Sequence, residues 1–231
     1  MRIAVMGTAG QGKSTFIKDF LKNWEGIYKS PDKTYRDVIK EKNLSHSRET
    51  TKETQLAILD FMVDQSMKYT TDDKVIYDRC SLDNMVYSIH ALDKQVGDID
   101  EDFIGDCIPL VRESTKFLDL IFLIPYDPSI KIEDDNMRET DVKYITEINQ
   151  LFLEIEKQSL TDHSVFFTKD DKPPIITLSG DPMERVRQAS LYISDDGGAS
   201  NGEDDEDGKI DWEGLAELGY KPKDFFPDGQ L

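Results

Sequence analysis

"GTAGQGKST" (residues 7–15) follows the apolar run "RIAVM" (residues 2–6) and precedes a helical pattern, and this stretch decides the fold. A glycine, four residues and then Gly-Lys-Ser is the pattern of a loop whose backbone N–H groups surround a phosphate chain. Gly7, Gly10 and Gly12 permit positive φ and a close approach of the backbone to the anion. The bound phosphates then lie at a helix N-terminus, where the helix dipole favours negative charge.

Two side chains of this loop can contact the phosphates or a metal ion directly. Lys13 supplies a cation for the phosphates and Ser14 supplies a hydroxyl for Mg²⁺. We therefore predict that ATP binds through Gly7, Thr8, Ala9, Gly10, Gln11, Gly12, Lys13, Ser14 and Thr15. A glycine-rich turn that only joins a strand to a helix is the alternative interpretation, but the strand-loop-helix context favours phosphate binding. The loop alone does not distinguish phosphate transfer from hydrolysis or switching.

Composition limits the class of protein. The chain has 231 residues and 38% hydrophobic content, which suits one sizeable α/β core. Its net charge of −19 divides into −10 for residues 1–194 and −9 for residues 195–231, which opposes binding of nucleic acid through a broad basic face. Cys80 and Cys107 are too few for a disulfide framework or a zinc site, so we expect buried free thiols.

The sequence contains no apolar run approaching the roughly 20 residues of a membrane span. The first predicted strand begins at Arg2, which leaves no room for a signal peptide. We therefore expect a cytoplasmic protein with no membrane partner, located in the host cytoplasm if a phage encodes it.

Three segments follow one another along the chain. Residues 1–193 form the predicted nucleotide-binding domain, and residues 194–209 are an acidic, Gly-rich flexible linker. Residues 210–231 again contain large apolar and aromatic side chains. We interpret this last segment as one that docks a protein partner or a second subunit. An apolar strip that covers a gap in the domain is the alternative.

Apolar segments alternate with helical patterns, which predicts an α/β fold with a parallel sheet of about five strands flanked by helices. The expected strands are 2–6, 74–77, 118–125 and 175–179, with a weaker one near Ile27. The expected helices are 15–23, one that begins near Thr50, 81–94, 102–116, 141–160 and 182–193. Thr50 and Glu53 form the capping-box pattern of the second helix.

Asp78 and Arg79 come at the carboxyl end of the predicted second strand, the edge where open α/β sheets bind ligands. Asp78 can bind Mg²⁺ or accept the proton of an attacking hydroxyl, and Arg79 can hold a phosphate. The alternative is an aspartate that caps the next helix with an arginine paired to it. Asp83 is a weaker substrate-binding candidate in the same pocket.

Two further segments belong to the predicted ligand edge. The polar stretch "IKIEDDNMRETD" (residues 130–141) is typical of a lid that closes over phosphates, with Arg138 as its cation. A solvated loop with Arg138 paired to a neighbouring acid is the alternative. Gly180 and Asp181 lie in a strand-to-helix turn that can line a purine ring, although this pattern is also an ordinary connection.

The acceptor must bind across from the nucleotide. The segment between the first two long helices contains Tyr35, which can stack on a base, and Arg36 and Arg48, which can hold a phosphate of the acceptor. Gln55 can read the edge of a base. Polar decoration of the surface explains these residues equally well.

Together, "GTAGQGKST", "VIYDRCSLDN" (residues 75–84), the Arg138 lid and "LSGDPMERV" (residues 178–186) resemble the P-loop kinase superfamily. The resemblance covers residues 1–193 and is closest to ribosylnicotinamide-kinase-like and thymidylate-kinase-like proteins, including forms common in tailed phages. It implies a kinase fold with a lid, ATP and Mg²⁺ as cofactors, and an acidic C-terminal extension outside the fold.

The resemblance also implies roles for individual residues. Lys13 and Ser14 would hold the triphosphate and Mg²⁺, Asp78 would be the metal partner or base, and Arg79 and Arg138 would act on the phosphates. The acceptor would be a nucleoside or nucleotide, or a hydroxymethylated pyrimidine in DNA, since some relatives phosphorylate 5-hydroxymethyluracil in DNA. We predict an ATP-dependent phosphotransferase. A nucleotide-dependent switch or a plain NTPase that acts through the C-terminal segment is the alternative.

Overall fold

The structure of the chain is a computed structural model, which describes residues 1–44, 50–130, 141–161, 164–168 and 171–200. The elements follow in the order β1 (Arg2–Gly7), α1 (Lys13–Asn23), α2 (Tyr35–Lys42), α3 (Lys52–Met67), β2 (Val75–Asp78), α4 (Ser81–Asp93), α5 (Glu101–Thr115), β3 (Leu120–Ile124), α6 (Val142–Ser159), β4 (Ile175–Thr177) and α7 (Pro182–Ser190). Strands and helices alternate, which confirms the predicted α/β class.

The described strands form one parallel sheet in the order β2-β1-β3-β4. The weaker strand expected near Ile27 is reduced to a single bridge between Lys29 and Val75, so the sheet has four strands instead of about five. Pro31 follows two residues after this bridge. Because proline has no backbone N–H to donate, it disfavours continuation of the ladder.

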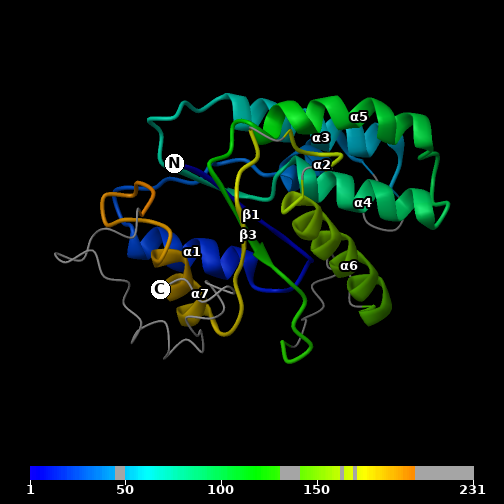
Figure 1. Ribbon diagram of the computed structural model, residues 1–231. Helices are drawn as coiled ribbons and strands as arrows, with labels where there is room; N and C mark the ends of the chain where they lie inside the picture. The colour runs from blue at the N-terminus through cyan, green and yellow to red at the C-terminus, as the bar shows by residue number, and fades with distance from the viewer. Residues whose placement is uncertain (45–49, 131–140, 162–163, 169–170, 201–231) are drawn as a thin grey trace.

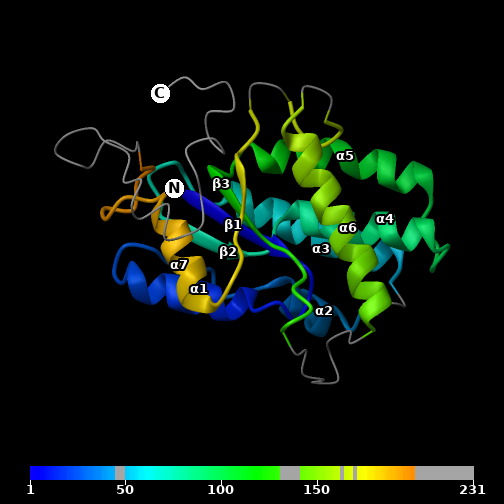
Figure 2. The ribbon, with the colours of Figure 1, turned by 60° about the horizontal axis from the view of Figure 1, so that its bottom comes forward.

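Helices cover both faces of the sheet (Figures 1 and 2). A cluster of buried hydrophobic side chains fills the space on each face. Successive side chains of β1 point to opposite faces, so Ile3 and Val5 pack against α1 and α7. Ala4 and Met6 pack into the second cluster, to which α3, α4, α5 and α6 contribute. Burial on both faces explains why β1 is apolar throughout instead of alternating.

All six predicted helices are present, and three features differ from the expectation. The helix α2 was not expected and packs against α3. The N-cap of α3 is Thr51, whose side chain accepts a hydrogen bond from the backbone N of Thr54, so the prediction that Thr50 caps this helix is wrong. Thr50 is buried, and its hydroxyl instead accepts a hydrogen bond from Gln55. The last helix, α7, ends at Ser190 instead of residue 193.

Residues 194–200, which the sequence analysis places in the linker, fold back onto the end of α1. The indole Nε1 of Trp24 donates to the carbonyl oxygen of Ser194 at 3.2 Å, and the Tyr28 hydroxyl donates to that of Gly197 at 2.8 Å. Both aromatic side chains are buried. The docking segment at residues 210–231 lies outside the described residues and stays a prediction.

The predicted burial of Cys80 and Cys107 as free thiols is confirmed. Among the helices that the structure describes, none combines the length and apolar character that crossing a membrane requires.

Candidate active site

The phosphate loop begins where β1 ends, at the edge of the sheet toward which β3 points in Figure 1. Gly7 has φ +137°, and a Cβ atom there would collide with the carbonyl oxygen of Ile124 in β3, so only glycine lets the loop start this close to the sheet. Gly10 and Gly12 also have positive φ, as expected. Gly12 is the N-cap of α1, which places the helix N-terminus directly behind the loop.

Lys13 lies across its own loop. Its ammonium group is buried and donates hydrogen bonds to the carbonyl oxygens of Gly7 at 2.8 Å and Thr8 at 2.5 Å. Burial lowers the pKa of Lys13 to about 7, and the nearby Arg79 cation adds to this effect. The loop is therefore short of negative charge, which a triphosphate would supply.

This pKa predicts that ATP binding depends on pH. A bound triphosphate raises the pKa of Lys13, so above about pH 7 binding must be accompanied by proton uptake. The affinity for ATP should fall with rising pH above 7, by at most about tenfold per pH unit, and this contribution should vanish below pH 7. Calorimetric titrations in buffers of different ionisation enthalpy measure the uptake. The Lys13→Met variant is the control, because its remaining pH dependence comes from titration of the nucleotide itself. If this variant showed the same slope of affinity against pH as the wild type, the assignment to Lys13 would be contradicted.

Ser14 and Asp78 come together from α1 and β2. The hydroxyl of Ser14 lies 3.3 Å from Oδ2 of Asp78 and donates to it. A hydroxyl and a carboxylate beside a phosphate loop suit Mg²⁺, which is usually held by one or two protein oxygens together with substrate phosphates. These two side chains therefore fit Mg²⁺ and would hold it if it binds here.

Arg79 and Asp83 form a buried ion pair behind the loop. Nη1 of Arg79 lies 2.7 Å from Oδ1 of Asp83, and both side chains are at most 6% exposed. The Asp83 carboxylate also accepts hydrogen bonds from the backbone N of Gly7 at 3.3 Å and of Cys80 at 3.0 Å. Asp83 thus holds Arg79, the start of α4 and the start of the phosphate loop together.

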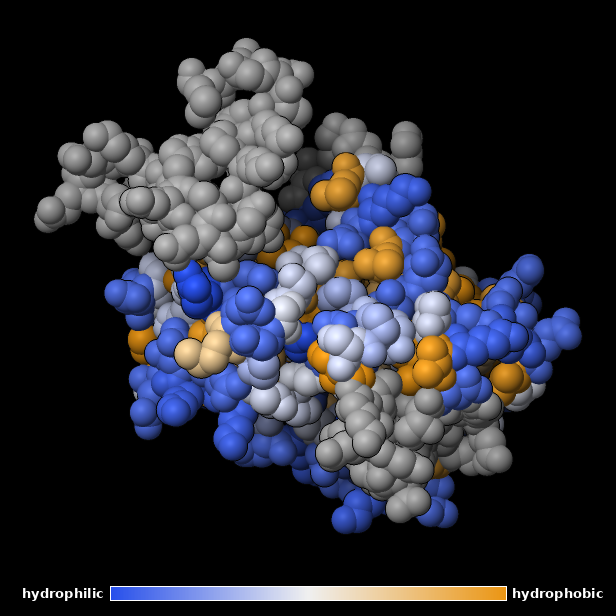
Figure 3. Space-filling model, turned by 90° about the horizontal axis from the view of Figure 1, so that it is seen from below, coloured by the Kyte–Doolittle hydropathy of each residue, from blue (hydrophilic) through white to orange (hydrophobic). Residues whose placement is uncertain are grey.

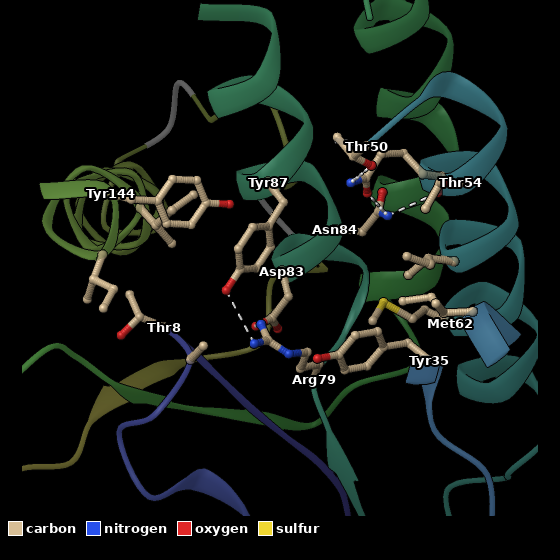
Figure 4. A pocket seen from close by; sticks show the side chains of 16 residues that line it. Thr8, Tyr35, Thr50, Thr54, Met62, Arg79, Asp83, Asn84, Tyr87 and Tyr144 are labelled. Atoms are coloured by element: carbon tan, nitrogen blue, oxygen red, sulfur yellow. Dashed lines mark hydrogen bonds and ion pairs between the residues drawn. The ribbon is translucent and has the colours of Figure 1, made fainter. Parts of the chain in front are cut away.

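An apolar cavity opens on the other side of Arg79 (Figure 4). It is lined by Thr8, Ala9, Tyr35, Ile39, Thr50, Thr54, Gln55, Ile58, Met62, Arg79, Asp83, Asn84, Tyr87, Tyr144, Ile145 and Ile148. The guanidinium of Arg79 lies between the rings of Tyr35 and Tyr87, 5.3 Å and 5.2 Å from their centroids. Tyr144 reaches the cavity from α6, so aromatic side chains from three helices surround it.

The apolar cavity meets a second, more polar cavity at the phosphate loop. Ala9, Gly10, Gly12, Lys13, Ser14, Thr15, Arg36, Asp78, Arg79 and Ile130 line this polar cavity. Ala9 and Arg79 belong to both linings. A ligand in the apolar cavity can therefore reach a phosphate chain in the polar one.

Three amide and hydroxyl side chains are linked along the wall of the apolar cavity. Nε2 of Gln55 donates to the hydroxyl of Thr50 at 2.8 Å, and Oε1 of Gln55 accepts from Nδ2 of Asn84 at 2.6 Å. Asn84 is 3% exposed, and its Oδ1 has no hydrogen-bond partner among the described residues. A buried acceptor without a partner is costly, so a donor group on a ligand would stabilise it.

A family model described as "AAA domain" matches residues 2–172 of the chain. The chain belongs to this AAA domain family. The match begins in β1 and contains the phosphate loop, both cavities and all elements through α6.

Solved structures show the same fold. Deoxyadenosine kinase from M. mycoides, solved with dCMP and dCDP, superposes with a TM-score of 0.60 at 17% identity, over 82% of this chain and 96% of that one. A thymidylate kinase from Candida albicans gives 0.55 at 16% identity, over 81% and 88%. NadR in complex with NR gives 0.59 at 16% identity, over 83% of this chain and 51% of NadR. The chain thus shares the fold of these proteins. Curated proteins offer no match.

The remaining predicted site residues of this AAA domain lie in different places. Arg36 borders the polar cavity, and its Nε donates to the Tyr35 hydroxyl at 3.3 Å. Gly180 and Asp181 border neither of the two cavities, and the Asp181 carboxylate caps α7 by accepting from the backbone N of Met183 and Glu184. Arg48 and Arg138 lie outside the described residues.

Tyr35, which the sequence offers as a group that stacks on a base, does line the apolar cavity, whereas sequence reasoning gave no site role to Tyr87, Asn84 and Tyr144. Tyr87 and Asn84 follow Arg79 by eight and five residues, on the first turns of α4. The helical pattern after "YDRC" (residues 77–80) places them near the ligand edge, and this signal was available. Nothing in the sequence relates Tyr144 to the loop, because α6 reaches the cavity only through tertiary packing.

Proposed function

We propose that this protein transfers the γ-phosphate of ATP to a nucleoside or nucleotide acceptor. The observation that carries the proposal is the junction of the two cavities at Ala9 and Arg79, beside Lys13. A plain NTPase needs only the phosphate site and a water molecule, whereas the adjoining aromatic cavity offers room for an organic acceptor. Two neighbours of the same fold are named as a deoxyadenosine kinase and a thymidylate kinase, which supports this choice of acceptor.

The apolar cavity suits a planar, polar ring. Tyr35, Tyr87 and Tyr144 offer faces and edges for a base, and Met62 adds an adaptable apolar surface. The unpartnered Oδ1 of Asn84 would accept a hydrogen bond from a ring N–H or an amino group. The acceptor that fits is therefore a base-containing molecule with a donor on the edge facing α4.

Different residues of the chain would have different roles in the transfer. Lys13 and Arg36 would neutralise charge on the transferred phosphoryl group, and Ser14 with Asp78 would hold Mg²⁺, which supplies further positive charge there. Arg79 would direct the acceptor oxygen toward the loop from the shared wall. Arg138 would close over the phosphates as the lid cation, and Gly180 and Asp181 would border the donor base.

Transfer of label from γ-³²P-ATP to a panel of acceptors tests the proposal. The panel contains nucleosides, nucleoside monophosphates, ribosylnicotinamide, and DNA with or without hydroxymethylated pyrimidines. We expect label on a base-containing small molecule. Label on the modified DNA alone would move the acceptor to a base turned out of the duplex into the same cavity. Label released only as free phosphate would overturn transfer and favour an NTPase or a switch that docks a partner through residues 210–231.

Replacing Asn84 with leucine should affect the acceptor and not ATP. The change removes the unpartnered acceptor atom and the bond to Gln55, so the KM of the acceptor should rise by about tenfold to a hundredfold while the KM of ATP stays constant. Steady-state kinetics with each substrate varied in turn measure both values. Asn23→Leu, at an exposed position of α1, is the control. Equal changes in both KM values would contradict a role in acceptor recognition.

A further inference from the structure

Arg185 is a buried cation that the proposed chemistry does not use. It lies on α7 and is 3% exposed. Its Nη1 donates a hydrogen bond of 2.7 Å to the backbone carbonyl oxygen of Gln11, in the phosphate loop 174 residues earlier in the chain. Burying a guanidinium is unfavourable unless it is well bonded, so this contact is the notable feature of the side chain.

The guanidinium also lies against the next residue of the loop. A Cβ atom built on Gly12 would be 3.2 Å from Nη1 of Arg185, closer than most real side-chain contacts. Arg185 therefore supports the loop at Gln11 and Gly12, immediately before Lys13. A side chain at position 12 would crowd this contact, and the positive φ of Gly12 favours glycine there as well.

The side chain of Gln11 is held by a different part of the chain. Its side-chain Oε1 accepts a hydrogen bond of 2.8 Å from the backbone N of Asp127, which follows β3. Gln11 itself is fully buried. The middle of the phosphate loop is thus held by α7 through its backbone and by the segment after β3 through its side chain.

The peptide unit between Gln11 and Gly12 relates the contact with Arg185 to the orientation of the next N–H group in the loop. The carbonyl group of Gln11 and the N–H group of Gly12 belong to one planar peptide unit and point in opposite directions. Because Arg185 binds the carbonyl from behind, the N–H of Gly12 is directed away from Arg185, and Gly12 borders the polar cavity. This is the orientation that a loop N–H needs to bind a phosphate oxygen.

The positive charge of Arg185 also favours binding of an anion by the loop. Arg185 makes no ion pair within the part of the chain that the structure describes, and its Nε has no hydrogen-bond partner there. Its positive charge is therefore only partly neutralised, and it lies directly behind a loop whose expected ligand is an anion.

We propose that Arg185 is a positioning residue of the phosphate loop, which orients the peptide between Gln11 and Gly12 for the phosphates of the nucleotide. This role rests on the proposed function only insofar as ATP binds the loop. Arg185 does not touch the acceptor cavity.

Direct binding of Mg-ATP to the full chain, measured by calorimetry, tests the role. Arg185→Met should weaken binding by about tenfold to a hundredfold, because a charge-assisted hydrogen bond and a nearby cation are lost. Arg185→Lys, whose ammonium can donate to the same carbonyl, should bind with intermediate affinity. Arg187→Met, on the exposed side of the same helix, should bind like the wild type. In kinetics, the KM of ATP should rise and that of the acceptor should not.

A purely structural role gives a different result. Arg185→Met would then melt at a lower temperature yet, while folded, bind Mg-ATP with wild-type affinity, and this outcome overturns the proposal. If Arg185→Met does not fold, a folded Arg185→Lys variant with wild-type affinity and KM overturns it instead. A wild-type protein that binds Mg-ATP but transfers no phosphate overturns the proposed function alone. A wild-type protein that does not bind Mg-ATP overturns both.

Discussion

Replacing Lys13 with methionine should reduce phosphate transfer by about a hundredfold to a thousandfold or more. The side chain is the only cation that both lies in the phosphate loop and donates to its carbonyl oxygens within the described residues. Methionine keeps the length of the side chain and removes the charge that the transferred phosphoryl group needs. Removal of one preorganised donor of this kind costs about 3 to 4 kcal/mol of transition-state stabilisation. Transfer of labelled phosphate at saturating ATP measures the loss.

The same substitution should not destabilise the nucleotide-free protein. Lys13 is buried and its charge is unfavourable there, as its lowered pKa indicates, so an apolar side chain of similar volume removes a cost of folding. We expect Lys13→Met to unfold at the wild-type temperature or above. Lys18→Met, at an exposed position of the same helix, is the matched control and should retain full activity. A fully active Lys13→Met variant would end the assignment of this loop to phosphotransfer.

The phosphate loop could be predicted because its geometry and its chemistry are both local. The glycines that adopt positive φ, the lysine and the serine stand within nine consecutive residues between a strand and a helix. The position of Asp78 could also be predicted, since a strand that ends at that residue in a parallel sheet places it at the same edge. The contact between Ser14 and Asp78 follows from these two facts.

The acceptor cavity could not be predicted in the same way, because its walls come from α2, α3, α4 and α6. In α2, α4 and α6 the tyrosines fit ordinary helical patterns. Packing alone decides that Tyr35 and Tyr87 lie on either side of Arg79. The alternative interpretation of an arginine paired with an aspartate near the start of α4 holds for Arg79, but its partner is Asp83 and not Asp78.

Adjacent threonines show a limit of local patterns. Thr50 and Thr51 both precede a helix with suitable acidic and polar residues, and either can cap it. The backbone N of Thr54 bonds to Thr51, which leaves Thr50 to pair with Gln55 beside the cavity. Gln55 was predicted to read a base. Gln55 lines the cavity, and its amide is bonded to Thr50 and Asn84, whose own Oδ1 has no partner among the described residues.

Replacing Asp83 with alanine should destabilise the protein by about 3 to 5 kcal/mol. The change leaves the Arg79 guanidinium buried without its charged partner, and a buried ion pair that loses one member shows losses of this size. It also removes the acceptor of the backbone N–H groups of Gly7 and Cys80. Urea unfolding followed by circular dichroism measures the difference. Because Gly7 begins the phosphate loop, the folded variant should also bind Mg-ATP more weakly.

A second variant separates the unpaired charge from the lost backbone contacts. Arg79→Met combined with Asp83→Leu removes both charges, so this double variant should be more stable than Asp83→Ala while it still lacks the acceptor for Gly7 and Cys80. Asp93→Ala, on the same helix with a side chain 70% exposed, should change stability by no more than about 0.5 kcal/mol. If Asp83→Ala proved as stable as Asp93→Ala, Asp83 would not be the residue that holds Arg79 behind the loop. If instead the double variant is no more stable than Asp83→Ala, the lost bonds from Gly7 and Cys80, and not the unpaired charge of Arg79, account for the loss of stability.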